Sequence, residues 1–219
     1  MPDAVIFDLD GLLLESEQVW NASKHRLTQE RGGTWRPEAQ HDMLGMSSTE
    51  WSRYMHDELG VLLDPDEISS EVVKRMTESY SEELPLLPGA DEAVRRVGAR
   101  WPLGLASSSN REIIDTVVER TGWAELFAVT VSSEEVERGK PAPDVYLETA
   151  RRLGVAPRRS VAVEDSNAGI RSAVAAGTGV VAVPNREYPP DPEALASADV
   201  VLDSLLELDE QAIERGAKT

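Results

Sequence analysis

Residues 5–20, VIFDLDGLLLESEQVW, place two carboxylates one residue apart directly after a short apolar run. The run at residues 5–7 is typical of a buried strand, and Asp8 and Asp10 come where that strand should end. In open parallel sheets, ligands bind beyond the carboxyl ends of the strands. An Asp-x-Asp pair can also form a simple turn, so its meaning depends on the residues at the ends of the other strands.

Five further β-rich runs follow along the chain, and helical stretches separate most of them. Strands are expected at residues 5–7, 103–106, 127–131, 160–163, 179–183 and 199–202. Amphipathic helices are expected at residues 111–120, 143–153 and 167–176, each with a capping residue at one end. This alternation predicts an α/β fold, a Rossmann-like doubly wound parallel sheet with helices on both faces.

Residues 16–84 interrupt this alternation, because they show helical periods and no convincing strand. The expected helices run from Ser16 to Gly32 and from Ser48 to Gly60, each beginning at a serine cap, and a third begins at about Pro65. We therefore expect an α-helical cap domain at 16–84, inserted into a core domain formed by 1–15 and 85–219. Linkers near Leu14 and Leu84 would let the cap hinge as a lid.

The composition excludes several classes of function. The 219 residues carry a net charge of −18, which disfavours nucleic acid or an anionic membrane as a partner. The absence of cysteine excludes disulfides, thiolate nucleophiles and cysteine-type zinc sites. Neither a signal-peptide pattern nor an apolar run of about 18 residues is present. We expect a cytoplasmic monomer that acts on a small molecule.

Polar residues follow other predicted strands as well. Ser107 begins a run of three serines after the second strand, and Lys140 lies in RGKPAPD, before the helix that leads to the fourth. Glu164 and Asp165 follow the fourth strand. Each group alone could be a turn, a helix cap or a surface loop. Their occurrence in order at matching strand ends favours one site, in which four carboxylates, a lysine and hydroxyls converge.

Such a site has a coherent chemistry. Clustered carboxylates raise one another's pKa unless a hard cation such as Mg²⁺ lies among them, and a magnesium site attracts phosphate. Ser107 and nearby backbone N–H groups can hold phosphoryl oxygens, and Lys140 can neutralise the remaining charge. With no cysteine and no evident Ser–His pair, the nucleophile is expected to be a carboxylate. One Asp can attack phosphorus while the other handles the proton, and the residues alone leave open which one attacks.

Four segments in this order, FDLDG, ASSSN, GKPAPD and VEDSNAGI, resemble the ordered motifs of the haloacid dehalogenase superfamily. The resemblance covers nearly the whole chain, and within the superfamily it is to the branch of small phosphatases and β-phosphoglucomutases. It implies a Mg²⁺-dependent phosphatase that hydrolyses a small organic phosphate monoester, such as a sugar phosphate, through an aspartyl-phosphate intermediate.

The resemblance also implies catalytic roles for four residues. Asp8 would be the nucleophile that becomes phosphorylated. Asp10 would be the general acid and base, and its backbone carbonyl would bind magnesium. Ser107 would hydrogen-bond the transferring phosphoryl group, and Lys140 would pair with Asp8 and the phosphate.

Metal and substrate contacts are implied by the same resemblance. Asp165 would ligate magnesium together with Asp8 and Asp10, and Glu164 would ligate it or orient its waters. Ser108 and Asn110 would lie on the phosphate side of the substrate. On the cap, the candidate substrate contacts are Trp20, Gly45, Ser47, Trp51 and Arg53, and the turn at residues 45–48 is the expected specificity loop.

Two other functions stay open. A β-phosphoglucomutase-like phosphomutase is the first, but related mutases carry a histidine where this chain has Trp20, and SEQVW at residues 16–20 is more similar to the sugar-phosphate phosphatases. Asp10 argues against dehalogenation, since the dehalogenases lack that residue. The second alternative is a non-catalytic binding protein on the same fold, although every catalytic position is filled here.

Overall fold

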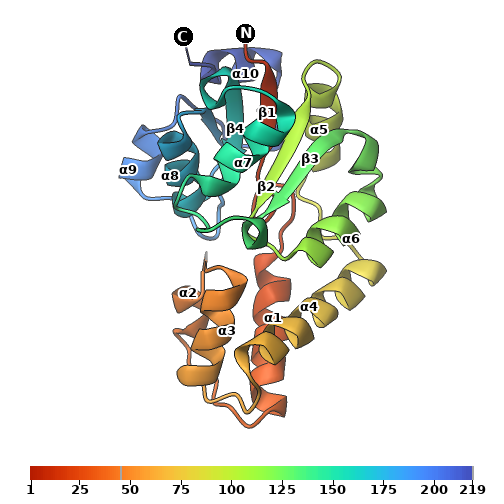
Figure 1. Ribbon diagram of the computed structural model, residues 1–219, viewed down its shortest axis with the longest axis vertical. Helices are drawn as coiled ribbons and strands as arrows, with labels where there is room; N and C mark the ends of the chain where they lie inside the picture. Colours follow the sequence, from red (N-terminus) through yellow and green to blue (C-terminus); the bar gives the residue numbers. More distant parts are fainter. Residues whose placement is uncertain (45, 219) are drawn as a thin grey trace.

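Six parallel strands form a single sheet in the order β3-β2-β1-β4-β5-β6 (Figure 1). The computed structural model describes residues 1–44 and 46–218. The strands are β1 (Ala4–Phe7), β2 (Leu103–Ser107), β3 (Phe127–Ser132), β4 (Ser160–Glu164), β5 (Gly179–Ala182) and β6 (Val200–Val201). All six predicted strands are confirmed to within a residue at each end, and the α/β fold class is confirmed with them.

The central position of β1 explains why its sequence is apolar throughout. β1 pairs with β2 on one side and with β4 on the other, and all four of its residues are buried. Val5 and Phe7 belong to the hydrophobic cluster on one face of the sheet, while Ile6 belongs to the cluster on the other face. A strand covered on both faces needs apolar side chains at every position, not at alternate ones.

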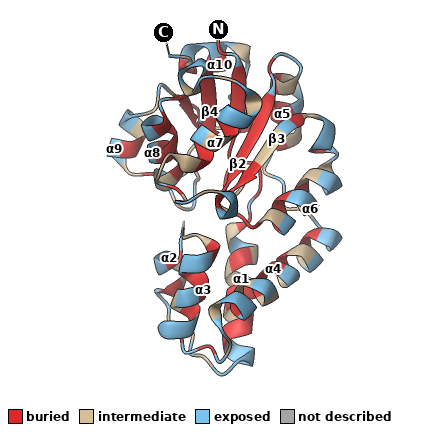
Figure 2. Cartoon of the chain, viewed as in Figure 1, coloured by how far each residue is buried: buried red, intermediate tan, exposed pale blue. Residues whose placement is uncertain are grey.

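Helices cover both faces of this sheet. They are α5 (Ala90–Gly98), α6 (Arg111–Thr121), α7 (Asp144–Leu153), α8 (Asn167–Ala176), α9 (Pro192–Ala196) and α10 (Glu210–Gly216). Helices α5, α6 and α10 pack on the sheet face of Phe7 through Val94, Ile113 and Ile213, respectively. Helices α7 and α8 pack on the face of Ile6 through Tyr146 and Ile170. Figure 2 shows the buried strands between these helices.

Residues 16–84 form α1 (Glu17–Glu30), α2 (Ala39–Asp42), α3 (Ser48–Asp57) and α4 (Pro65–Glu82), which lie together below the sheet in Figure 1. α4 packs against α1, α3 and α6. The two connections to the sheet run side by side, because Glu15 N donates to Pro85 O at 2.8 Å and Leu87 N donates to Leu13 O at 2.9 Å. The hinged lid and the division into two domains stay predictions.

The helix start predicted at Ser16 is confirmed in position but not in its side-chain cap, and the start predicted at Ser48 is off by one residue. Ser16 stands at the start of α1 with helical dihedrals, φ −85° and ψ −22°, and its side chain accepts no capping hydrogen bond. The cap of α3 is Ser47, not Ser48, because Ser47 is extended and forms a capping box with Glu50. α1 ends at Glu30, before the predicted Gly32. No helix among the described residues combines the length and the apolar character needed to cross a membrane.

Candidate active site

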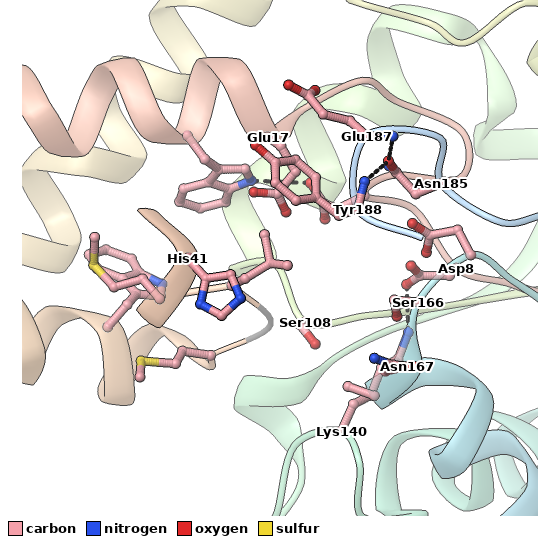
Figure 3. Close-up of a pocket in the computed structure, with 18 of the residues that line it drawn as sticks. Asp8, Glu17, His41, Ser108, Lys140, Ser166, Asn167, Asn185, Glu187 and Tyr188 are labelled. Carbon is pink, nitrogen blue, oxygen red and sulfur yellow. Dashed lines mark hydrogen bonds and ion pairs between the residues drawn. The ribbon is translucent and has the colours of Figure 1, made fainter. Parts of the chain in front are cut away.

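A cavity of about 500 Å³ lies between the ends of β1, β2 and β4 and the helices α1 to α3 (Figure 3). From the sheet side it is lined by Asp8, Asp10, Ser108, Lys140, Asp165 and Asn167. From the helical side it is lined by Glu17, Trp20, Lys24, His41 and Trp51, and by Met46 in the connection between α2 and α3. Cavities of this volume are typical of sites for small molecules. Segments far apart in sequence therefore bring the predicted polar residues to one place.

Lys140 connects two buried carboxylates on adjacent strands. Its Nζ lies 2.6 Å from Asp8 Oδ1, at the end of β1, and 2.6 Å from Glu164 Oε1, at the end of β4. All three side chains are at least nine-tenths buried. Burial acts to lower the pKa of Lys140, but the charges of Asp8 and Glu164 outweigh it and hold that pKa above its usual value. The amine is therefore a permanent cation beside Asp8.

The pKa of Asp8 is raised to about 7, mainly by burial and also by the charges of Glu164 and Asp10, which together outweigh the opposing charge of Lys140. The pKa of Asp165 is raised well above its usual range, first by burial and then by the charges of Glu164 and Asp8. One lysine does not neutralise this cluster. The site holds more carboxylates than it can keep ionised without another cation.

The geometry of three carboxylates fits a divalent cation. Asp8, Glu164 and Asp165 each offer one carboxylate oxygen, and these oxygens lie within 4.8 Å of one another. Asp165 Oδ1 is buried and has no hydrogen-bond partner among the described residues. A hard cation such as Mg²⁺ prefers oxygen ligands of this kind. A buried carboxylate oxygen without a hydrogen-bond partner, beside two other carboxylates, fits a cation ligand.

Glu164 differs from the other two carboxylates because both of its oxygens are engaged. Oε1 accepts hydrogen bonds from Lys140 Nζ and from Tyr146 Oη, each at 2.6–2.7 Å. Oε2 accepts from Asp165 N at 3.0 Å and from the backbone and hydroxyl of Ser166 at 3.4 and 3.3 Å. This network fixes the orientation of Glu164, and it leaves Asp8 and Asp165 as the carboxylates with more lone pairs available to a cation.

Asp10 accepts hydrogen bonds from both sides of the cavity. Trp20 Nε1, on α1, donates to Asp10 Oδ1 at 3.2 Å. Ser107 and Ser109 donate through their hydroxyls to Oδ2 at 3.2 and 2.7 Å. The Asp10 carboxylate is thus held between the sheet and α1.

Several predicted contacts lie elsewhere. Ser107 is fully buried and faces Asp10, whereas its neighbour Ser108 lines the cavity. Asn110 is buried, and its Nδ2 donates to Glu134 Oε1 at 2.7 Å, so it anchors the start of α6 and does not line the cavity. The expectation that Asn110 faces the substrate therefore does not match its position here.

The predicted contacts on α3 divide between its two faces. Trp51 is buried and lines the cavity, but Arg53 is exposed and does not. Residues two apart on a helix point in nearly opposite directions, which explains why both could not face the same space. Ser47 is used in the cap of α3. Gly45 lies outside the described residues, although its neighbour Met46 lines the cavity.

Sequence reasoning missed several site residues. Ser109 was the third serine of ASSSN and had no assigned role. Tyr146 lies on the buried face of α7, where its apolar neighbours gave no sign of a polar contact. Lys24, on α1, follows Trp20 by one turn and is buried against the cavity. Tyr188 comes from the segment after β5, and its hydroxyl accepts from Gln40 Nε2, on α2, at 2.5 Å.

Two glycines of the motifs are required by close approach. A Cβ on Gly169, in the first turn of α8, would lie 1.8 Å from Glu164 Oε1. Gly11 has a positive φ of 82°, and a Cβ there would lie 2.2 Å from Asp165 Oδ2. The backbone is therefore packed directly against the carboxylates, and neither position tolerates a side chain without displacing one of them.

We expect Gly169→Ala to displace the Glu164 carboxylate from Lys140 and to reduce any activity of the site by at least tenfold. The added methyl group cannot be accommodated, because the atom it meets belongs to a side chain held by five donors. Gly139→Ala is the matched control, since its nearest neighbour would be at 3.6 Å, an ordinary contact. Turnover and thermal unfolding of both variants test this, and equal effects would contradict it.

Comparison with known proteins identifies a family and several related phosphatases. Residues 5–183 match the family described as haloacid dehalogenase-like hydrolase. Hexitol phosphatase B of Escherichia coli (strain K12) is 33% identical over 224 residues, which cover 94% of this chain and 93% of that protein. The bifunctional riboflavin kinase/FMN phosphatase of Arabidopsis thaliana is 32% identical over 210 residues; the match covers 95% of this chain but only 55% of that longer protein.

The fold is also similar to that of solved structures. The crystal structure of CbbY from Rhodobacter sphaeroides in complex with phosphate has a TM-score of 0.87 and 26% identity, covering 98% of this chain and all of that chain. The match to the family spans most of the present sequence, from β1 to the residue after β5. The chain therefore belongs to the haloacid dehalogenase-like hydrolase family.

Proposed function

We propose that this chain is a Mg²⁺-dependent phosphatase that hydrolyses a small organic phosphate monoester, such as a sugar phosphate, through an aspartyl-phosphate on Asp8. The observation that carries the proposal is the 2.6 Å contact between the Lys140 ammonium and Asp8 Oδ1 inside a cavity of about 500 Å³. This contact supports Asp8 as a nucleophilic carboxylate held beside a fixed cation. The same Lys140 ammonium can also contact a phosphoryl oxygen. The phosphatases among the relatives support the same reaction class.

In the first step, an oxygen of Asp8 attacks phosphorus, and the bond from phosphorus to the ester oxygen breaks. Asp10 gives its proton to the departing oxygen, so that an alcohol leaves. Lys140 stays charged throughout and attracts the phosphoryl oxygens. Ser108, which lines the cavity, is placed to donate to the phosphoryl group, and Ser107 acts by orienting Asp10 at 3.2 Å.

In the second step, Asp10, now a carboxylate, takes a proton from water while the water oxygen attacks phosphorus. The bond from phosphorus to Asp8 breaks, inorganic phosphate forms and the Asp8 carboxylate is restored. The hydrogen bonds from Trp20 and Ser109 hold the Asp10 carboxylate as an acceptor, the state this step requires.

Magnesium, when bound, supplies positive charge to the phosphoryl oxygens and to the surrounding carboxylates. Asp8, Asp165 and the backbone carbonyl of Asp10 would hold it. Glu164 would orient the site from beside it, because its oxygens already accept from Lys140 and Tyr146. The orphaned Asp165 Oδ1 supports this assignment.

Hydrolysis is favoured over a phosphomutase reaction by Trp20. Its indole N–H donates to Asp10 Oδ1, and an indole has no acceptor nitrogen with which to take a proton from a sugar hydroxyl. A histidine at that position could relay a proton, as the resemblance to the mutases implies. A cytoplasmic location and a monomeric state stay predictions.

The nucleophile is tested by Asp8→Asn with p-nitrophenyl phosphate and magnesium. We expect turnover to fall by at least a thousandfold and the phosphorylated enzyme to disappear from the intact-protein mass spectrum, because an amide does not form the acyl phosphate. Asp3→Asn, at the surface pair with Arg159, is the control and should retain full activity. Substantial turnover in Asp8→Asn would overturn the assignment.

The reaction class is tested by phosphorus NMR of products from hexose and hexitol phosphates. Inorganic phosphate alone is expected, since water is the acceptor in the second step. Isomerised sugar phosphate appearing before inorganic phosphate would favour the mutase. Tight ligand binding without any product would favour the non-catalytic alternative.

The clustering of carboxylates at the proposed metal site is tested by the pH dependence of stability in EDTA. The pKa of Asp8 is raised from 3.8 to about 7, so its contribution to stability is present below about pH 4 and is lost as the pH rises through 7. Asp165 acts in the same direction. Protein in EDTA should therefore melt several degrees lower at pH 8 than at pH 5, since about 1 kcal/mol shifts the melting temperature of a chain this size by roughly 2–4 °C.

Added Mg²⁺ should raise the melting temperature more at pH 8 than at pH 5, because the ionised carboxylates bind it. Asp8→Asn is the matched control, and its melting temperature in EDTA should fall less between these pH values. A metal-free protein whose melting temperature does not change from pH 5 to pH 8 would contradict the expected clustering of charge.

A further inference from the structure

Lys24 is a buried cation in the wall of the active-site cavity that has no acceptor within the described residues. The side chain lies on α1 and is 8% exposed. Its Nζ is 5.1 Å from the ring centroid of Trp20 and 4.9 Å from that of Trp51, and all three residues line the cavity. Among the described residues, the charges of Glu17 and Asp10 attract the Lys24 ammonium, and neither carboxylate accepts a hydrogen bond from it.

A buried ammonium without an acceptor is unusual, because burial of an unpaired charge is costly. Burial lowers the pKa of Lys24 to about 8, while the charges of Glu17 and Asp10 act to raise it. The two indole faces offset part of the cost through cation–π contacts, but a ring face satisfies none of the three N–H donors in the way that an oxygen does. These donors are available to a molecule in the cavity.

The other lysine in the cavity wall is already used. Lys140 contacts Asp8 and Glu164 at 2.6 Å, at the end where the phosphoryl group would bind. Lys24 belongs to α1, on the helical side of the cavity. The cavity as a whole, at about 500 Å³, is larger than a phosphoryl group needs. Glu17, on the same helix as Lys24, and Glu187 also line the cavity and would repel an anion. Lys24 is the lysine of the α1 lining that can offset this repulsion, so an anionic group on the helical side is expected to bind at its ammonium.

We propose that Lys24 is a specificity-determining residue that binds an anionic group, a carboxylate or a second phosphate, at the end of the substrate remote from the phosphoryl group transferred to Asp8. This inference rests on the phosphatase activity proposed above. It predicts a preference for substrates with two anionic ends, set by a residue on α1 that takes no part in the bond-breaking steps.

The test compares three substrates that share a six-carbon chain with a phosphate on C6. Sorbitol 6-phosphate ends in a hydroxymethyl group, 6-phosphogluconate ends in a carboxylate, and sorbitol 1,6-bisphosphate ends in a second phosphate. The kcat and KM of each are measured with Mg²⁺ for the wild type and for Lys24→Met, which keeps the apolar stem. The two anionic substrates distinguish the carboxylate from the phosphate as the preferred group.

We expect wild-type kcat/KM to be higher for at least one anionic substrate than for sorbitol 6-phosphate. In Lys24→Met that ratio should fall by at least tenfold, mainly through KM, and Lys24→Arg should restore part of it. Lys74→Met, which removes an exposed lysine on α4 outside the cavity, is the matched control and should leave the ratio unchanged. Thermal unfolding of each variant checks that it is folded, and Lys24→Gln provides a second uncharged replacement.

A ratio that is the same in Lys24→Met, Lys24→Gln and the wild type would overturn this inference while leaving the phosphatase proposal intact. A wild-type preference for sorbitol 6-phosphate over both anionic substrates would overturn it too. Failure of the wild type to hydrolyse p-nitrophenyl phosphate and all three substrates would instead overturn the proposed function, and this inference with it.

Discussion

The ammonium of Lys140 between Asp8 and Glu164 is the interaction on which the rest of the site depends. Two carboxylates at the ends of adjacent buried strands repel each other in a medium where water cannot screen them. The lysine makes their proximity tolerable, with both contacts at 2.6 Å. Tyr146 and the tight approach of Gly169 to Glu164 then fix the second carboxylate, so that one cation and one hydroxyl organise the ends of two strands.

The strand order explains why these groups meet at all. β1 lies between β2 and β4, so the residues at the ends of three strands distant in sequence emerge next to one another. β1 supplies Asp8 and Asp10, β2 leads to Ser109, and β4 supplies Glu164. A parallel sheet places all these ends at one edge, and a single dense patch of charge results from topology together with a few polar residues.

The sequence was sufficient for the strands, the fold class and the convergence of Asp8, Lys140 and Asp165, because apolar runs and polar strand ends are local signals. It could not place side chains on helix faces. Tyr146 is typical of a core residue, and only tertiary packing directs its hydroxyl to Glu164. The prediction that Arg53 faces the substrate is not matched for the same reason, since its position on α3 turns its side chain to the exposed surface and away from the cavity.

The helices α1 to α3 contribute differently from the sheet. Trp20 and Lys24 are one turn apart on α1, so they share a face, and that face meets the cavity. Trp20 reaches Asp10 across the cavity, while Lys24 rests against Trp20 and Trp51. The hydrogen bond to Asp10 and the buried amine thus depend on the position of the same helix. A displacement of α1 would alter the orientation of Asp10 and the helical wall of the cavity together, so the Asp10 carboxylate and the Lys24 side of the cavity are mechanically linked.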